Sequence, residues 1–586
     1  MIKLFKNLTK KDLLIVLVVV ILVVFSVFLD LRLPEYMSNI TKLIQTEDST
    51  MNEILLAGVH MIICAVGSLL CTISVGYFTS LLSARFSRNI RRRIFEKVES
   101  FGIAEIKKFS TSSLITRTTN DVTQIETLLA MGLQLLIKAP VMAVWALLKI
   151  VGKSGELSLV TLAGVIIIVV TNLIIISIVS PRFEKIQKLT DKINGVTREN
   201  ITGIRVVHAF NAEKFEEKRF NKVNDDLTSI HLRITKTFAL MEPVMNFVMQ
   251  FQHLGIYIVG AYLIMHSTIL DKINIFSNMV VFSSYGIQVI ISFLMLTFIF
   301  MVLPRAKVSA DRINEVLESD VSIISGDFKS KTKEVGTVKF ENVSFKYPDA
   351  SEYLLKNISF EVSKGQTIAF IGSTGSGKTT LINLVPRFYD ATDGNVLVDG
   401  VNVKDYDLKE LNNRIGYVSQ KAVMFTGTVE ENVSYGDNGR KKPNNKIIKE
   451  SLDIAQATEF VEKMTDKYKS HIARGGTNVS GGQKQRLSIA RAIARNPEIY
   501  IFDDSFSALD YKTDAKLRHE LRKHTKDATI MIVAQRIGTI MNADKIVVLD
   551  KGKCVGIGTH KELLKSCEVY KEIALSQLSE EELQNA

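Results

Sequence analysis

The chain has 586 residues, of which 47% are hydrophobic, and a formal net charge of +12 at pH 7. The apolar share is high for a protein that is soluble throughout, and the length allows two or more domains. No basic patch interleaved with aromatic residues accompanies the positive charge. This argues against nucleic-acid binding and favours cationic surfaces that face an anionic membrane leaflet.

Long apolar runs are confined to the first 303 residues, at 13–29, 55–82, 128–151, 157–180, 244–269 and 275–303. The first run has 17 uncharged residues, which is at the short end of what crosses a bilayer. A cleaved signal peptide is the alternative for it, but the run has no small-residue cleavage site and five further runs follow. We therefore predict an α-helical membrane domain with six spans and with both ends on the same side of the lipid bilayer.

The distribution of Lys and Arg predicts which side that is. The segments between runs two and three and between runs four and five are rich in charge, and the former carries Arg85, Arg88, Arg91, Arg92, Arg93, Lys97, Lys107, Lys108 and Arg117. The opposite loops have Lys42, Lys153 and Lys272 as their clear cations. Because cytoplasmic loops carry the excess of Lys and Arg, we predict a multi-pass protein of the cell (plasma) membrane with both termini cytoplasmic. About 12 residues precede the first run, so we expect no fused peptidase domain.

The two long cytoplasmic segments are patterned mostly as polar helices, so spans two to five are expected to continue well below the bilayer. Each segment contains a short turn with an aromatic residue, at 109–121 and at 210–215. Such a turn is either a docking foot for another domain or an ordinary capped turn.

The soluble half begins after a polar stretch at 319–336, which predicts a linker between a membrane domain at 1–318 and a second domain at 337–586. Strand and helix patterns alternate in the second domain, which predicts an α/β fold. Its strand-like run 367–371 is followed by the loop 372–379 and then by a helix. Its residues, all predicted to bind nucleotide, are Gly372, Ser373, Thr374, Gly375, Ser376, Gly377, Lys378 and Thr379, with Thr380 next to them.

This loop is a phosphate-binding pattern in the strand-to-helix context that it requires. Backbone N–H groups and the helix N-terminus bind phosphate oxygens, Lys378 reaches the terminal phosphates, and Thr379 binds magnesium. The pattern alone predicts an ATP or GTP site.

Further motifs surround the loop. Tyr347 lies in a turn where its ring could stack on adenine, although a turn tyrosine by itself is more often structural. Gln420 follows a short apolar run, and Ser480, Gly481, Gly482 and Gln483 precede a predicted helix. The apolar run 499–502 ends in Asp503, and Asp510 follows shortly after.

The order and spacing of these motifs resemble the ATP-binding cassette of ABC transporters, and six spans ahead of one cassette resemble a half-transporter of the multidrug exporter type. The resemblance covers nearly the whole chain, and the turns at 109–121 and 210–215 match the coupling helices of the family. It implies ATP and Mg²⁺ as ligands, with Thr379, Gln420 and Asp503 on the metal. It also implies a dimer, in which each ATP lies between the phosphate loop of one cassette and the signature turn, here residues 480–483, of the other. Asp510 corresponds to the D-loop.

Two residues depart from the family pattern. Asp504 stands where a glutamate usually polarises the attacking water, and it is shorter by one methylene, or about 1 to 1.5 Å, a displacement that can cost on the order of a hundredfold in rate. Gln535 stands where a histidine is usual, and an amide cannot carry positive charge to the transition state. Together with Gln420 these form the predicted catalytic set. The pattern resembles the degenerate-site subunit of a heterodimeric exporter, paired with a second half-transporter; a homodimer with two slow sites is the alternative.

The sequence says less about the transported compound, the cargo. Glu242, Asn246, Gln250 and His253 recur at helical spacing in span five, and ionisable groups at membrane depth usually face a protein interior or a wet cavity. Contact with a small amphipathic or drug-like substrate and hydrogen bonding between helices are both open interpretations. We predict export of such compounds from the cytoplasm; a nucleotide-gated regulatory subunit is the alternative function.

Overall fold

The computed structural model describes residues 1–586 except 7, 47–48, 152, 331 and 579–586. Its contacts divide the chain into two compact units. The first comprises Met1–Glu99 and Thr111–Ser319, and the second comprises Ser100–Ser110 and Asp320–Ala586. We call them the membrane unit and the cassette unit. A short piece of the N-terminal half therefore belongs to the cassette unit.

The membrane unit is entirely helical in its described regular structure. Its helices are α1 (Ile2–Phe5), α2 (Lys10–Gln45), α3 (Met51–Glu99), α5 (Thr111–Thr116), α6 (Val122–Thr127), α7 (Leu133–Val151), α8 (Gly155–Thr202), α9 (Ile204–Ala209), α10 (Glu213–Ala239), α11 (Met241–Met265) and α12 (Ile269–Leu317). π-Helical turns at Arg117–Asp121 and Leu128–Gly132 join α5, α6 and α7. Six helical stretches among the described residues are long and apolar enough to cross a membrane, which confirms the predicted six spans.

These helices extend far beyond bilayer thickness. α3 has 49 residues, which at 1.5 Å per residue is about 74 Å, whereas the hydrocarbon core of a bilayer is about 30 Å thick. The helix α2 begins at a capping box, in which the Thr9 hydroxyl accepts from the Asp12 N–H and the Asp12 carboxylate accepts from the Thr9 N–H. The rest of α2 is apolar enough to be stable only where its side chains avoid water.

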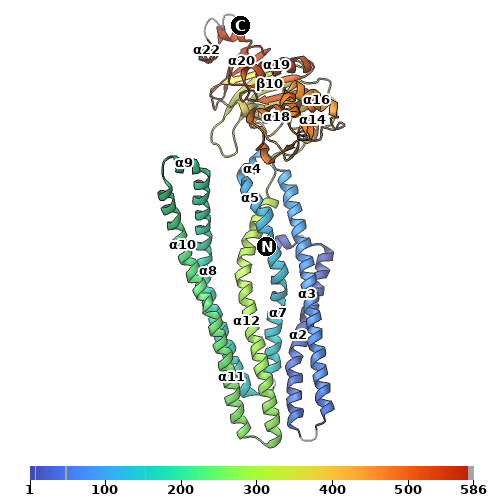
Figure 1. Cartoon of the computed structure of the whole chain (residues 1–586), viewed down its shortest axis with the longest axis vertical. Coiled ribbons are helices and arrows are strands. Elements are labelled where there is room, and N and C mark those ends of the chain that lie inside the picture. The colour runs from blue at the N-terminus through green and yellow to red at the C-terminus, as the bar shows by residue number, and fades with distance from the viewer. Residues whose placement is uncertain (7, 47–48, 152, 331, 579–586) are drawn as a thin grey trace. The chain divides into compact units, whose positions relative to one another are not determined.

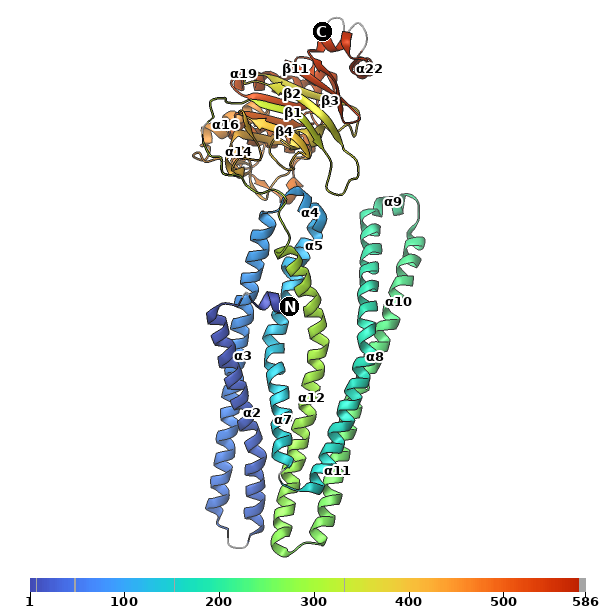
Figure 2. The same ribbon diagram turned by 180° about the vertical axis from the view of Figure 1, so that it is seen from behind.

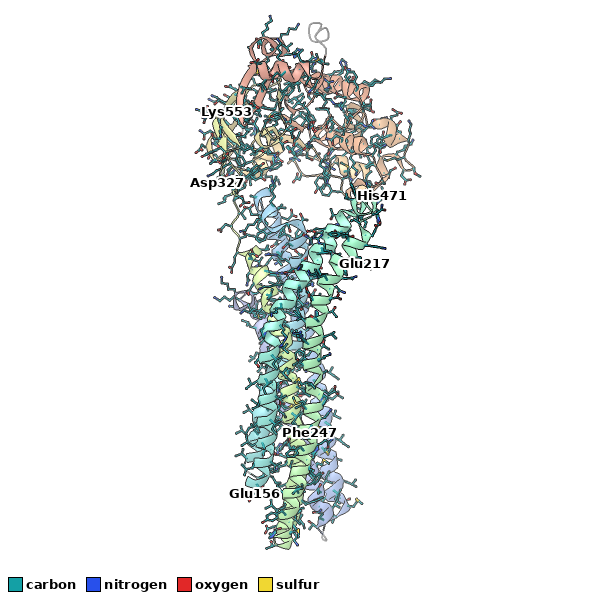
Figure 3. All side chains as sticks on the ribbon, turned by 90° about the vertical axis from the view of Figure 1, so that its left-hand side faces the viewer. Glu156, Glu217, Phe247, Asp327, His471 and Lys553 are labelled. Carbon is teal, nitrogen blue, oxygen red and sulfur yellow. The ribbon has the colours of Figure 1, made fainter. Side chains whose placement is uncertain are left out.

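Within the membrane unit, α2, α3, α7 and α12 pack together, while α8, α9 and α10 form an arm that stands apart from them at the α9 end (Figures 1 and 2). Figure 3 labels Glu156 near one end of this arm and Glu217 near the other, with Phe247 on the following helix. The arm rejoins the bundle through α11, where Ile256 packs with Val27, Phe282 and Tyr285 in a fully buried cluster.

The two predicted cytoplasmic turns differ in outcome. The chain does turn at 210–212, between α9 and α10. The other turn is present only at Ser110, which has φ of 59° and is not helical; 111–121 is helical, and the chain also breaks earlier, after Glu99. The short helix α4 (Ile103–Phe109) follows that break and packs in the cassette unit, where Ile103 contacts the core. The polar residues of 111–121 are helical because a polar run is compatible with a long helix as well as with a turn.

The cassette unit is an α/β domain, as predicted. Its strands are β1 (Val338–Phe345), β2 (Leu355–Val362), β3 (Thr367–Gly372), β4 (Asp393–Val398), β5 (Val401–Asn402), β6 (Ile415–Val418), β7 (Gly427–Thr428), β8 (His471–Ile472), β9 (Ile499–Asp503), β10 (Thr529–Val533), β11 (Lys545–Asp550) and β12 (Lys553–Gly558). Besides α4, its α-helices are α13 (Lys378–Asn383), α14 (Leu408–Arg414), α15 (Val429–Val433), α16 (Asn445–Ile454), α17 (Thr458–Glu462), α18 (Gly481–Ala494), α19 (Tyr511–His524), α20 (Ile537–Ile540), α21 (His560–Ser566) and α22 (Glu568–Leu575).

Strand order explains how distant motifs meet. The main sheet has the order β12-β11-β3-β10-β9-β6, and β11, β3, β10, β9 and β6 are parallel. The carboxyl ends of parallel strands lie at one edge of the sheet, which is where α/β folds bind ligands. Loop 372–379 follows β3, Asp504 follows β9, and Gln535 comes two residues after β10. A second, antiparallel sheet has the order β2-β1-β4-β5.

Candidate functional site

The phosphate loop joins β3 to α13, as the sequence predicts. Gly377 precedes the helix with φ of 96°, and Gly372 has φ of 154°. A Cβ on Gly372 would lie 2.0 Å from the backbone oxygen of Leu549 in the neighbouring strand. Glycine is therefore required at Gly372 by the close approach of two strands, and at Gly377 by the left-handed backbone that turns the loop into the helix.

Lys378 is folded back over the loop. Its Nζ donates to the backbone oxygens of Gly372 and Ser373, each at 2.8 Å. Burial lowers the pKa of Lys378, and the nearby carboxylates of Asp504 and Asp503 oppose that shift. These loop carbonyls are weak substitutes for phosphate, so the ammonium can exchange them for oxygens of a bound triphosphate.

Thr379 and Asp503 form the metal side of the site. The Thr379 hydroxyl donates to Oδ1 of Asp503 at 2.8 Å, and Asp503 is 2% exposed. Burial raises the pKa of this carboxyl, and the hydrogen bond from Thr379 and the charge of Lys378 oppose that shift. Oxygen ligands of this kind suit Mg²⁺, which is usually held by one or two protein groups plus substrate phosphates.

Asp504 accepts hydrogen bonds from two glutamines. Its Oδ2 accepts from Nε2 of Gln535 at 2.8 Å and from Nε2 of Gln420 at 3.3 Å. The residue is 8% exposed and sits in a left-handed conformation with φ of 47°, and its N–H donates to the backbone oxygen of Val533 at 3.0 Å. The structure therefore brings the three residues of the predicted catalytic set into one hydrogen-bonded group.

Tyr347 lies beside the start of α13. Its hydroxyl is 2.8 Å from the hydroxyl of Thr380, and its ring meets the ring of Tyr389 edge to face, with centroids 5.3 Å apart. The Lys107 ammonium of α4 lies 5.0 Å from the Tyr347 ring centroid. Thr380 is 6% exposed, so its side chain contacts Tyr347 and is shielded from solvent.

The signature turn lies at the start of α18. Ser480 caps that helix: its hydroxyl accepts from the Gln483 N–H at 3.3 Å, and the Gln483 side chain accepts from the Ser480 N–H at 2.9 Å. Ser480 and Gly481 are exposed, and Asp510 caps α19 in the same way by accepting from the Thr513 N–H. Among the described residues no hydrogen bond joins this turn to the phosphate loop.

The four polar residues singled out in span five all lie on α11. Glu242, Asn246 and Gln250 are exposed within the single chain and His253 is half-buried. Glu242 lies 23 residues before the end of α11, or about 35 Å along the helix, a length comparable to the thickness of a hydrocarbon core of about 30 Å. Gln250 and His253 lie nearer that end of α11.

Several polar contacts in the structure are not predicted by the sequence patterns. In the membrane unit Lys138 pairs with Asp30 at 3.2 Å and Lys149 with Glu35 at 2.7 Å; opposite charges on two spans are a signal that could have found them. In the cassette unit, the amide of Gln577 binds the backbone on both sides of Arg536. A lone exposed glutamine near the end of the chain carries no sequence signal of this kind.

Two different family models match the N-terminal and C-terminal halves of the chain. Residues 14–293 match the model of the ABC transporter transmembrane region, and residues 355–507 match the model described as ABC transporter. The chain is 40% identical over 510 residues to an uncharacterized ABC transporter ATP-binding protein of Mycobacterium bovis, covering 87% of this chain and 86% of that one. It is 32% identical over 508 residues to an ATP-dependent lipid A-core flippase of Haemophilus influenzae, covering 86% and 84%.

A solved structure has the same fold. It is a bacterial Atm1-family ABC exporter with ATP bound, with a TM-score of 0.81 and 21% identity, covering 97% of this chain and 100% of that one. Six apolar helices fused to a C-terminal α/β domain are thus the shared architecture.

Proposed function

Because the chain belongs to the ABC transporter family, in which a cassette binds ATP, typically with Mg²⁺, and drives transport, we propose that it is one subunit of a heterodimeric exporter and that its own phosphate loop forms a slow ATP site. The observation that carries this proposal is the group made by Asp504, Gln420 and Gln535. In this group the aspartate carboxylate accepts hydrogen bonds from two neutral amides, whereas the family pattern has a longer glutamate at the position of Asp504 and an ionisable histidine at the position of Gln535.

The arrangement favours retention of ATP over its hydrolysis. Lys378, Thr379 and Asp503 supply the contacts that hold phosphate and metal. A carboxylate on Asp504 ends about 1 to 1.5 Å short of where a glutamate would place it, and position errors of this size cost on the order of a hundredfold in rate. Gln535 can donate a hydrogen bond to the γ-phosphate, but it brings no charge to the transition state.

The signature turn is the contribution of this chain to the other site. ABC exporters function as dimers, and the exposed N-terminus of α18 at Ser480 presents the backbone N–H groups and the positive helix end that bind an anion. We propose that this turn completes the ATP site of a second half-transporter, in which hydrolysis is fast. At the tip of the arm, Phe210 and Phe215 are 78% and 69% exposed, which supports docking of the α9 turn on the cassette of that partner.

We propose an amphipathic, drug-like or lipid-like compound as cargo, moved out of the cytoplasm. The polar face of α11 supports this, because Asn246, Gln250 and His253 lie among exposed apolar residues such as Phe251 and Leu254. A face of this kind contacts either cargo or the spans of a partner. Flipping of a lipid by the Haemophilus influenzae relative is compatible with such a cargo class.

The test is ATP hydrolysis by the reconstituted dimer. Removing the catalytic glutamate of the partner should nearly abolish turnover, while labelled ATP still occupies the site around Lys378; Lys378→Ala should remove that occupancy. Strong turnover by this chain purified alone would refute the slow-site proposal and favour a homodimer. ATP-driven dye transport in vesicles separates an exporter from a nucleotide-gated regulatory subunit, since only the exporter moves dye.

A further inference from the structure

The segment that carries Gln535 is held by a residue from the far end of the cassette unit. Gln577 lies two residues beyond α22, and its amide makes two hydrogen bonds to the backbone after β10. Nε2 donates to the oxygen of Gln535 at 2.8 Å, and Oε1 accepts from the N–H of Ile537 at 2.8 Å. One planar amide thus forms hydrogen bonds to the backbone on both sides of Arg536, and we call this pair of bonds the clamp.

The helix that precedes Gln577 is packed into the core of the cassette unit. α22 packs against β3 and β11, with Tyr570 and Ala574 fully buried, and the Tyr570 hydroxyl lies 2.7 Å from Nδ1 of His560. Leu578 packs against the same core. The Gln577 side chain is itself exposed, and its backbone lies between the buried Ala574 and the partly buried Leu578.

The segment is exposed at Gln535 and Arg536 and is held after them: Ile537 is fully buried, and the Arg518 guanidinium donates to the carbonyl oxygens of Gly538 and Thr539. The exposed part is where the Gln577 amide binds. Among the described residues, Gln577 is the hydrogen-bond partner of the Gln535 backbone oxygen. From there the contacts continue through Nε2 of Gln535 to Oδ2 of Asp504.

We infer that Gln577 is a positioning residue for the ATP site: by holding the backbone at Gln535 and Ile537, it sets where the Gln535 amide meets Asp504 and the γ-phosphate. The inference rests on the proposed function in assigning Gln535 to the γ-phosphate. ADP has no γ-phosphate, so loss of the clamp should weaken retention of ATP and leave retention of ADP unchanged.

The experiment uses the full-length chain in lipid nanodiscs with Gln577→Ala, Gln577→Glu and, as a matched control, Ser576→Ala. Ser576 is the preceding exposed residue, and its hydroxyl donates to the carbonyl of Ile573 in α22. The first readout is hydrogen exchange at the Ile537 amide. Gln577→Ala should speed exchange by about fivefold, as expected for loss of one hydrogen bond. Gln577→Glu should preserve protection because it keeps the acceptor, and Ser576→Ala should have no effect.

The second readout is the ratio of ATP to ADP dissociation constants. Gln577→Ala should weaken ATP binding by about five- to tenfold with ADP binding unchanged, and Gln577→Glu should have part of that effect. Unchanged exchange at Ile537, an equal effect of Ser576→Ala, or equal loss of ATP and ADP binding would each overturn the inference. If the wild-type chain hydrolyses ATP fast on its own, the slow-site proposal fails, while the exchange and ratio measurements still decide the role of Gln577.

Discussion

Restoring the usual catalytic pair should turn the slow site into a fast one. In the double variant Asp504→Glu with Gln535→His, the carboxylate moves outward by about 1 to 1.5 Å and an ionisable ring replaces the amide. A displacement of that size is worth on the order of a hundredfold in rate, or about 2.7 kcal/mol of activation free energy. Asp504→Glu alone should give less, because Gln535 Nε2 and Gln420 Nε2 both bind Oδ2 in the present arrangement and would still engage the longer side chain.

Single-turnover hydrolysis of ATP bound at this phosphate loop is the assay, with the fast site of the partner inactivated. Asp504→Asn is the control, because it keeps the size of the side chain and removes the charge that polarises water; it should lower the residual rate further. A rate for the double variant within about twofold of wild type, with ATP still bound, would refute the claim that these two residues limit hydrolysis.

Three further predictions concern other parts of the chain. Lys138→Met should leave Asp30 unpaired between the spans and lower stability by about 3 to 5 kcal/mol, seen as a lower thermal midpoint in detergent, and adding Asp30→Asn should restore much of it; no recovery would contradict the pairing. Tyr347→Ala should weaken ATP binding by about 1 to 3 kcal/mol, the worth of one base stacked on an aromatic ring, whereas Tyr347→Phe, which loses only the bond to Thr380, should cost less; equal losses would exclude stacking. Burial raises the pKa of Asp503, and only the ionised carboxylate binds a cation. Mg²⁺-dependent ATP binding should therefore be lost on acidification at a pH above the ordinary pKa range of a carboxyl group, and the midpoint pH of this loss should fall as the Mg²⁺ concentration increases. Asp503→Asn should abolish this Mg²⁺ dependence.

Much of the site was predictable because its parts are local. The loop 372–379 lies between a strand and a helix, and Ser480 stands directly before a helix that it caps, so each motif is complete within a few residues. The six spans were also predictable, since a bilayer of known thickness demands long apolar runs. The first cytoplasmic turn was predicted too broadly, because a polar run such as 111–121 is compatible with both a helix and a turn, and only Ser110 within 109–121 is not helical.

What only the tertiary structure decided are the contacts between residues that are far apart in the chain. Asp504 and Gln535 follow different strands, and they meet because β9 and β10 are parallel neighbours. Gln577 reaches the same segment because α22 packs against the sheet. The sequence by itself determined which chemical groups the protein owns and the local structures that display them, since caps, glycine loops and apolar runs act over a few residues. The folded sheet decided which groups touch, because hydrogen bonds depend on ångström distances that strand order and packing set.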